Sequence, residues 1–347
     1  MLVAPETLTA IVDRILRAAG ADAEAAAVVA RSLVGSDLCG VSSHGAMRVP
    51  EYLRAISAGR IVPAARPQVA SDHGAVVMLD GRRAFGQVAA RELTAVATQR
   101  ARAHGVALAM LAGVQHVGRL GEWVELAAEA GCVALAWCNC GDPYGNVVPF
   151  GGRRARLGTN PMAYALPAGT EPAVVADFST SIVAEGKVRL FRHAGDAVPE
   201  GWLVDSRGHA TTDPEMLYAG GAILPAGGHK GFALSLLVEV LGGLLAGAGC
   251  PSLGESPGNG LVLVVIDPAC GADGDAFPAG VAAVLESIRA AGPDVRIPGE
   301  PERHVRDRQT AGIPLAPRIW RTLVDAAATV AVDLEHEPTN EGDVRVI

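Results

Sequence analysis

The chain has 347 residues, of which 50% are hydrophobic and 4% aromatic, so its cores must be built from Ala, Val and Leu. A formal net charge of -8 and the lack of a basic run argue against a nucleic-acid partner. No signal pattern follows Met1, and the most apolar run, residues 232–248, is interrupted by Glu239 and too short to span a bilayer comfortably. We therefore expect a cytoplasmic protein of two lobes or two to three domains, without a membrane partner.

The first sixty residues show the spacing of helices. Apolar residues recur at helical intervals from Leu8 to Leu16, and Gly20 ends the pattern. An alanine-rich second helix over residues 21–34 and a third over 47–57 follow. Three helices with short loops predict a helical layer that brings residues 40–53 toward the rest of the chain.

From about Pro63 strands and helices alternate. This alternation predicts an α/β sheet with helices packed on it, and taken alone it favours parallel strands. The predicted strands are 75–79, 106–112, 133–137, 162–166, 173–178 and 261–266, and the predicted helices are 88–104, 120–130, 213–218, 231–245, 280–291 and 318–328.

Residues 40–53 contain a hydroxyl, an imidazole and a guanidinium close together, on Ser43, His44 and Arg48. If a helix starts near His44, then His44 and Arg48 lie four residues apart on one face. The imidazole can carry a proton and the guanidinium can bind a carboxylate through two hydrogen bonds. Chemistry on a 2-oxo or 2-hydroxy acid needs both. The alternative is an ordinary helix N-terminus with a serine cap and a chance histidine.

Two further clusters place polar groups beside predicted turns. His116 lies at a strand-to-helix turn, where Gly118 lets a ligand approach the backbone and the helix N-terminus suits an anion. Thr159 and Asn160 precede Pro161, which holds them extended with their side chains available for hydrogen bonds. The alternatives are a structural loop histidine and a plain pre-proline loop.

Another pair of clusters lies at a strand end and at a helix start. Asp177, Ser179 and Thr180 follow an apolar strand, at the kind of position where α/β sheets often bind ligands. His229 and Lys230 follow two glycines and precede a long apolar helix, so amides and an ammonium could hold a phosphate together. The alternatives are an ordinary Ser/Thr turn and a solvated helix cap.

Several motifs are missing from the chain. No strand is followed by GxGxxG, the Rossmann dinucleotide fingerprint, and there is no GxxxxGK[ST] phosphate loop. No HExxH or His-carboxylate spacing indicates a metal. A hydrolase is disfavoured because the adjacent Ser43 and His44 rarely align as nucleophile and base, and no GxSxG elbow exists. A degenerate binding protein, which would keep the fold but not turn over a substrate, is disfavoured because the chain retains all of the polar clusters described above.

Eight motifs, in order over residues 37–302, carry a family resemblance: DLCGVSSHGAMRVPEY, DGRRAFGQ, HVGRLGEW, GTNPMAYALP, DFSTSIVAEGK, PEGWLVDSRGHATTDP, LPAGGHKG and IPGEPE. In these the chain resembles the malate/L-lactate dehydrogenase-like oxidoreductases, a nicotinamide-dependent family without the Rossmann fold. The family includes ureidoglycolate, sulfolactate and diketogulonate enzymes and cyclic ketimine reductases.

The resemblance implies a fold and an assembly. The fold is an α+β arrangement with a mixed, mostly antiparallel sheet and flanking helices. Residues 1–62 and 310–347 would form a helical domain, and residues 63–309 the cofactor-binding α/β domain with a small helical subdomain. The assembly would be a homodimer whose active site lies near the subunit boundary.

The resemblance also implies roles for single residues. Ser43 and His44 match the family's Ser-His-Gly motif, Arg48 its substrate-carboxylate arginine, and His116 a histidine that some members use as proton acceptor. No metal is implied. The positions expected to face NAD or NADP are His116, Gly118, Asn139, Thr159, Asn160, Asp177, Ser179, Thr180, His229, Lys230, Gly299 and Glu300.

The expected reaction passes a hydride between nicotinamide C4 and substrate C2. His44, oriented by Ser43, moves the proton with His116 as second choice, and Lys187 polarises the carbonyl oxygen or orients the proton donor. Cyclic imine reductases of the family carry an aspartate near the Lys187 position, whereas a lysine there disfavours a protonated iminium. A 2-oxo or 2-hydroxy acid is therefore preferred. The alternative is a cyclic imine such as delta1-piperideine-2-carboxylate or delta1-pyrroline-2-carboxylate, and the choice between NAD and NADP stays open.

Overall fold

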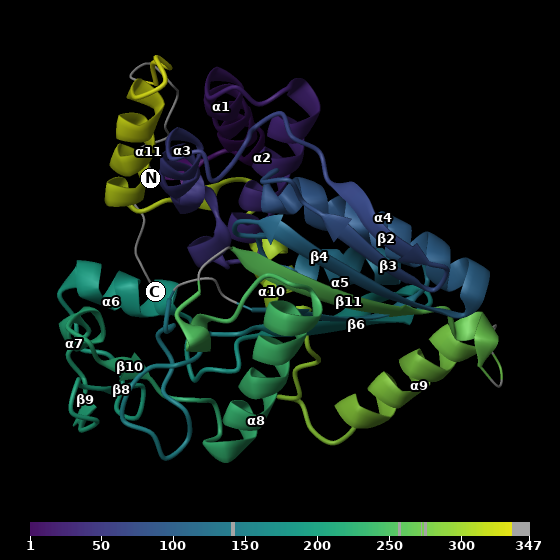
Figure 1. The fold of residues 1–347 in the computed structure, drawn as a ribbon. Helices are drawn as coiled ribbons and strands as arrows, with labels where there is room; N and C mark the ends of the chain where they lie inside the picture. The colour runs from purple at the N-terminus through teal and green to yellow at the C-terminus, as the bar shows by residue number, and fades with distance from the viewer. Residues whose placement is uncertain (140–142, 256–257, 272, 274–275, 335–347) are drawn as a thin grey trace.

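The computed structural model describes residues 1–139, 143–255, 258–271, 273 and 276–334. A seven-stranded sheet lies at its centre, with the strand order β2-β3-β4-β11-β5-β6-β7 (Figure 1). Only β3 and β4 run parallel, and every other neighbouring pair is antiparallel. The strands are β2 (Gln68–His73), β3 (Val76–Asp80), β4 (Val106–Val114), β5 (Val133–Cys138), β6 (Met162–Ala168), β7 (Glu171–Phe178) and β11 (Asn259–Ile266).

The mixed, mostly antiparallel sheet implied by the resemblance is confirmed. The parallel sheet favoured by local alternation is wrong, because β11 comes from late in the chain and inserts between β4 and β5. Strand β2 was not predicted: Gln68–His73 is an edge strand whose side chains are mostly exposed, so it carries no apolar alternation.

Helices cover both faces of the sheet and one of its ends (Figure 1). They are α1 (Pro5–Ala18), α2 (Ala23–Leu38), α3 (Val49–Ser57), α4 (Gly86–His104), α5 (Leu120–Glu129), α6 (Glu185–Ala194), α7 (Glu215–Tyr218), α8 (His229–Val238), α9 (Phe277–Arg289), α10 (Glu300–Arg308) and α11 (Pro317–Ala328). Helices α4 and α5 share a core with Leu111 and Leu263 on one face. Because side chains alternate along a strand, Met110 and Val262 point to the other face. There they meet the π-helical segment η3 (Glu239–Leu245), which continues α8.

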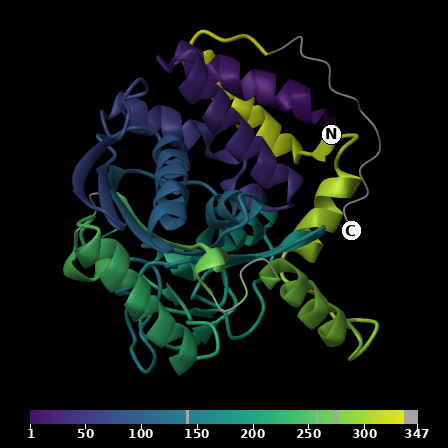
Figure 2. The same cartoon turned by 90° about the vertical axis from the view of Figure 1, so that its right-hand side faces the viewer.

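The two ends of the chain build one helical unit. Helices α1, α2, α3 and α11 surround a common apolar core that includes Leu16, Leu33 and Leu323. Figure 2 shows α11, in yellow, among the purple N-terminal helices. The short strands β1 (Leu2–Val3) and β12 (Ile313–Pro314) pair beside it. Helix α11 therefore packs with the three N-terminal helices, while the division into the domains implied by the resemblance stays a prediction.

A small subdomain contains α6, α7 and a three-stranded sheet in the order β10-β8-β9. Its strands are β8 (Leu203–Val204), β9 (Ala210–Thr211) and β10 (Ala222–Ile223), and its core includes Leu203, Leu217 and Ile223. This unit combines helices with strands too short to show a periodic pattern, and the small helical subdomain implied by the resemblance, which has no stated bounds, stays a prediction.

The apolar helix expected over residues 231–245 is only partly buried. Leu236, Leu237 and Leu244 are 50%, 44% and 61% exposed, because only one side of α8 and η3 faces the sheet. Of the helices in the described part of the chain, none combines the length and apolar character that a bilayer span requires.

Replacing Leu323 by alanine tests whether the C-terminal helix is part of the helical core. Leu323 is 1% exposed in that core, so Leu323→Ala is expected to lower the free energy of unfolding by about 2–5 kcal/mol. Arg321→Ala, at an exposed position of the same helix, should change it by less than about 0.5 kcal/mol. Chemical denaturation measures both, and equal effects would contradict the shared core.

Candidate active site

A cavity of about 240 Å³, the main cavity, opens between the helical unit and the sheet, where β4, β5 and β7 end and β6 and β11 begin. Its lining comes from many separate segments, including the end of α2, the β4–α5 loop, the end of β7 and the starts of α6 and α10. A side cavity of about 200 Å³ adjoins it. Together they reach the size of small-molecule sites, roughly 300–1,000 Å³. Both cavities are lined by Arg48, His116, Thr159, Glu185 and Asn259.

Two 3₁₀ turns, η1 (Ser42–His44) and η2 (Ala46–Arg48), carry the first polar groups. No helix starts at His44, so the condition under which His44 and Arg48 would share one helix face is not met. Gly45 between the turns is extended, with φ -89° and ψ -157°, and α3 begins only afterwards. His44 and Arg48 therefore reach the main cavity from two consecutive turns and not from one helix face.

The side chain of Asp37, at the end of α2, imposes this break. Its Oδ2 accepts a hydrogen bond from the backbone nitrogen of Ala46 at 2.7 Å. A Cβ built on Gly45 would overlap the Asp37 carboxylate, so only glycine fits there. Burial raises the pKa of Asp37 to about 7, against the hydrogen bonds from Ala46 and Ser42 that favour its charged form.

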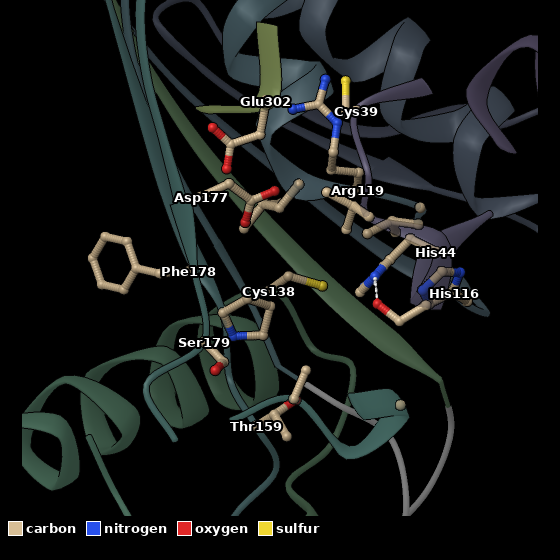
Figure 3. A pocket seen from close by; sticks show the side chains of 18 of the residues that line it. Cys39, His44, His116, Arg119, Cys138, Thr159, Asp177, Phe178, Ser179 and Glu302 are labelled. Carbon is tan, nitrogen blue, oxygen red and sulfur yellow. Dashed lines mark hydrogen bonds between the residues drawn. The ribbon is translucent and has the colours of Figure 1, made fainter. Parts of the chain in front are cut away.

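His44 is held by its neighbour and stays neutral at pH 7. The hydroxyl of Ser43 lies 3.0 Å from Nδ1 of His44, a hydrogen bond drawn as a dashed line in Figure 3. Burial lowers the pKa of His44 to about 3, with further lowering by the charges of Arg48 and Arg119. The orienting role expected for Ser43 fits this contact.

His116 lies beside His44, with 5.1 Å between the ring centroids. The hydroxyl of Tyr52 on α3 lies 2.8 Å from Nδ1 of His116. Burial, Arg48 and His44 lower the pKa of His116 well below 6.5, so this ring is also neutral. Among the described residues, the buried Nε2 of His116 has no hydrogen-bond partner. An unused polar atom on a wall of two cavities is suited to bind a ligand.

Arg48 is held from two sides at the cavity wall. Its Nε donates to the carbonyl oxygen of Ser43 at 2.7 Å, and its Nη1 lies 2.6 Å from a carboxylate oxygen of Glu51. Nη2 forms no hydrogen bond within the described parts of the chain. The guanidinium is thus fixed in orientation, with one nitrogen still available to a carboxylate.

Opposing charges line the wall toward α5. Arg119 bonds Glu125 at 2.8 Å, and Asp177 accepts from the backbone nitrogen of Gly121 at 2.6 Å. Burial raises the pKa of Asp177, while Gly121 and Arg119 partly oppose the rise. One amide of the α5 N-terminus, the helix end that the sequence offered to an external anion, is therefore already bound by Asp177. Figure 3 shows Asp177 and Arg119 above Cys138, with the two histidines to one side.

The main cavity brings together residues from four of the predicted clusters, together with Gly299, a position implied by the resemblance. The members that line it are Ser43, His44, Arg48, His116, Gly118, Thr159, Asp177, Ser179 and Gly299. Polar groups at strand ends and glycine-flanked turns were therefore informative, because strand ends and loops gather where helices dock on the sheet.

Four other predicted cofactor residues are engaged by the protein itself. Asn139 joins Gly249 and Gly260 through its amide. Thr180 donates to the carbonyl oxygens of Thr159 and Asn160. The amide of Asn160 donates to Ser235 on α8 and to Glu239 on η3. The carboxylate of Glu300 on α10 pairs with Arg289 on α9 at 2.8 Å. None of the four is among the residues that line the described cavities.

The remaining predicted residues are exposed. The ammonium of Lys187 lies over the ring of Trp202, 5.7 Å from its centroid, outside the lining of the main cavity. His229 and Lys230 begin α8 at the surface, with the ring of His229 in contact with Phe150. Their predicted roles would need a ligand or a second chain that reaches them.

Asp37, Tyr52 and Gln87 were not singled out from the sequence, although they hold His116 and the segment that carries His44 and Arg48. Each lies inside a motif that carries the resemblance. The roles of Tyr52 and Gln87 depend on partners far along the chain, and that of Asp37 on a turn that its own segment forms. Glu185 was also missed; it lines both cavities and accepts from Tyr218 at 2.7 Å. In the described residues, no cluster of three or more His, Cys, Asp or Glu is arranged to hold a metal.

Three comparisons relate the chain to known proteins. The sequence profile of the malate/L-lactate dehydrogenase family matches residues 3–324. Hydroxycarboxylate dehydrogenase B from Escherichia coli is 35% identical over 350 residues, covering 95% of this chain and 94% of that protein. L-lactate dehydrogenase from Cupriavidus necator is 37% identical over 331 residues, covering 92% and 95%. The solved structure of delta1-piperideine-2-carboxylate reductase from Pseudomonas syringae has a TM-score of 0.85 at 33% identity, covering 94% and 99%.

A pair of glycine substitutions tests the break between the two 3₁₀ turns η1 and η2. Gly45→Ala forces a methyl group into the Asp37 carboxylate and should lower the free energy of unfolding by about 1–3 kcal/mol or more. Gly35→Ala, on α2 with no heavy atom within 4 Å of the added carbon, should be neutral or stabilise by up to about 1 kcal/mol. Chemical denaturation compares them. Equal effects would contradict the packing.

Asp37→Asn tests the buried carboxyl through pH. Because the folded protein raises the pKa of Asp37 to about 7, its contribution to stability is present below about pH 4 and is lost as the pH rises to 7. Stability of the variant relative to the natural chain should therefore rise over that range, on the order of 1.4 kcal/mol per pH unit. His44 and His116 occur in both proteins, so the difference isolates Asp37. A difference independent of pH would refute the assignment.

Proposed function

We propose, from the premise that the chain belongs to the malate/L-lactate dehydrogenase family, that it is an NAD(P)-dependent oxidoreductase of small 2-oxo or 2-hydroxy acids. One observation carries the proposal: two neutral histidines and a fixed arginine face the same cavity. An acid substrate needs a carboxylate-binding group and a proton-exchanging group next to the carbon that reacts.

The lining of the main cavity fits a nicotinamide coenzyme. Gly118 and Gly299, both with positive φ, bring backbone close to the cavity without side-chain bulk. Phe178 offers an apolar ring that is 42% exposed, and Ser179 a hydroxyl. Arg303 lies on the same wall and suits a phosphate. When bound, the nicotinamide supplies or accepts a hydride at C4.

Arg48 orients the acid and His44 moves its proton. A carboxylate on Nη2 of Arg48 would bind with two hydrogen bonds if it also displaced Glu51 from Nη1. In the direction of oxidation, neutral His44 accepts the hydroxyl proton as the C2 hydride departs, and in reduction it returns the proton to the oxygen. Ser43, through its contact with Nδ1, keeps the ring in place.

Substrate binding would itself change the basicity of His44. The positive charge of Arg48 lowers the pKa of both His44 and His116 in the free protein. A bound carboxylate neutralises that charge and so raises both pKa values. The proton acceptor therefore becomes a stronger base when the substrate is in place.

A cyclic imine is the second candidate substrate, and Glu185 favours it. The carboxylate of Glu185 lines both cavities, where it would stabilise a protonated iminium. The ammonium of Lys187, which argued against an iminium, lies over Trp202 outside the cavity lining. The choice of an acid now depends on the Arg48–His44 arrangement and on the two dehydrogenase relatives.

The assembly proposed is a homodimer in the cytoplasm. Supporting it, α8, η3 and the turn after them carry an exposed apolar face, with Leu236 50%, Leu244 61% and Leu253 68% exposed. A contiguous apolar surface of this kind marks an interface more often than free surface. A second chain over α8 would also cover His229 and Lys230. The cytoplasmic location remains the expectation from the sequence.

A substrate panel tests the function. The purified protein is mixed with NADH or NADPH and a series of 2-oxo acids and cyclic imines, and loss of nicotinamide absorbance is followed. Turnover of at least one 2-oxo acid is expected. Turnover of cyclic imines alone would replace the first candidate by the second, and no binding of either coenzyme would refute the proposed oxidoreductase.

Arg48→Lys tests the carboxylate clamp. A lysine cannot form the fork of two hydrogen bonds, so kcat/KM should fall about 10²-fold, mainly through KM. Arg54→Lys, at an exposed position on α3, serves as the matched control and should keep the natural kinetics. A loss confined to kcat would contradict the clamp.

The pH dependence of oxidation tests the coupling between Arg48 and His44. The pKa seen in kcat should lie above the pKa seen in kcat/KM, because only the substrate complex has the Arg48 charge neutralised. Rates at saturating and at limiting substrate, measured across pH, give the two values. Identical values, or a lower one in kcat, would rule out the coupling.

A further inference from the structure

A row of three polar side chains leads from the protein interior to the cavity wall. Gln87 on α4 is fully buried, and its Nε2 lies 2.6 Å from the hydroxyl of Tyr52. That hydroxyl, on a side chain that is 2% exposed, lies 2.8 Å from Nδ1 of His116. The row therefore connects α3, α4 and the β4–α5 loop behind the site.

The donors in this row can be ordered from one end. An amide nitrogen only donates, so Gln87 donates to the oxygen of Tyr52. The Tyr52 hydroxyl has a single proton, so it donates its one hydrogen bond to Nδ1 of His116. That nitrogen must therefore be unprotonated. The ring is neutral because burial and Arg48 lower the pKa of His116. Its one proton is therefore on Nε2.

The orientation of the Gln87 amide fixes this order. With the amide reversed, Gln87 would accept from Tyr52, Tyr52 would accept from Nδ1, and Nε2 would be bare. The reversed amide would put an NH₂ group where Oε1 now lies, a buried position without a hydrogen-bond partner among the described residues. A buried carbonyl oxygen without a partner is tolerated better than buried N–H groups without one.

Building on the oxidoreductase function above, we propose that Gln87 and Tyr52 are positioning residues that hold His116 as its Nε2–H tautomer, a fixed hydrogen-bond donor toward the substrate oxygen. Such a donor polarises a carbonyl and stabilises the negative charge that grows on its oxygen during reduction. His116 keeps its own proton, so the two histidines divide the work. His44 exchanges the proton and His116 stabilises the oxygen.

Several charged groups act on this row. Arg48 and Glu51 lie near Tyr52, together with Glu122 from α5, and Arg48 and His44 act on His116. These groups shift proton affinities, but they do not form the row. Among the described residues, the Gln87 amide is the group that bonds the buried end of the row, so its chemistry decides which way the hydrogen bonds run.

Nitrogen NMR of the histidine rings tests the tautomer directly. Protein labelled with ¹⁵N-histidine is examined by two-bond ¹H–¹⁵N correlation, and His116→Gln identifies the ring. The natural protein should show a protonated Nε2 and an unprotonated Nδ1. A protonated Nδ1 would overturn the proposal. The spectrum is taken on resting protein, so it tests the row whether or not a 2-oxo acid is turned over.

Gln87→Glu reverses the row without changing its shape. A carboxylate accepts from Tyr52, so Tyr52 accepts from Nδ1 and Nε2 loses its proton. When the buried carboxyl is protonated at low pH it donates as Gln87 does, so the kcat of reduction should match the natural enzyme there. Above the carboxyl pKa, kcat should fall about 10²-fold with little change in KM.

Thr94→Val is the matched control for this variant. Thr94 is a buried polar residue on the same helix that donates to Ala90 at 2.9 Å, away from the cavities. It should keep the natural tautomer and pH profile. A Gln87→Glu protein with the tautomer and pH profile of the Thr94→Val control would refute the proposal. If Gln87→Glu fails to fold, Tyr52→Phe decides: without the donor, His116 should lose its single tautomer.

Discussion

The hydrogen bond between Tyr52 and His116 is the interaction on which the site depends. It joins the helical unit to the sheet, and these two units hold the two halves of the lining. The bond joins two buried side chains, with Phe85 beside Tyr52 at 6.2 Å between ring centroids. A small shift of one unit would leave buried polar groups unpaired, at a cost of about 1–3 kcal/mol each. Docking is therefore restricted to the arrangement in which Ser43, His44 and Arg48 face the loop that carries His116.

Charge in the cavity is balanced by pairs, while the histidines stay neutral. Arg48 pairs with Glu51 and Arg119 with Glu125, and both arginines lower the pKa of His44. An anionic substrate changes this balance at one point, Arg48. Binding and proton affinity are then linked, because the same charge governs both. Binding of the substrate carboxylate to Arg48 therefore raises the pKa of His44 before any bond to C2 breaks or forms.

The sequence predicted many of the residues that line the main cavity. It did not predict those whose position depends on contacts between distant parts of the chain. His116, Thr159 and Asp177 were found because polar residues at strand ends and beside glycines are recognisable locally. Lys187 lies outside the lining of the main cavity, and its catalytic role stays a prediction. Its neighbour Gly186 packs on Ser43, where an added Cβ would lie 2.8 Å from the Ser43 Cβ. Consecutive residues on a helix point about 100° apart, so Lys187 turns away to Trp202.

By itself the sequence determined the local elements, the family and the chemical kinds of group available, because periodicity, capping and motif order are local properties of the chain. Only the tertiary structure decided which groups meet. The helical unit docks on the sheet of its own chain, β11 inserts between β4 and β5, and Tyr52 bonds a histidine 64 residues away. It also decided that both histidines are neutral, since burial and nearby arginines act through space and leave no mark in the order of residues.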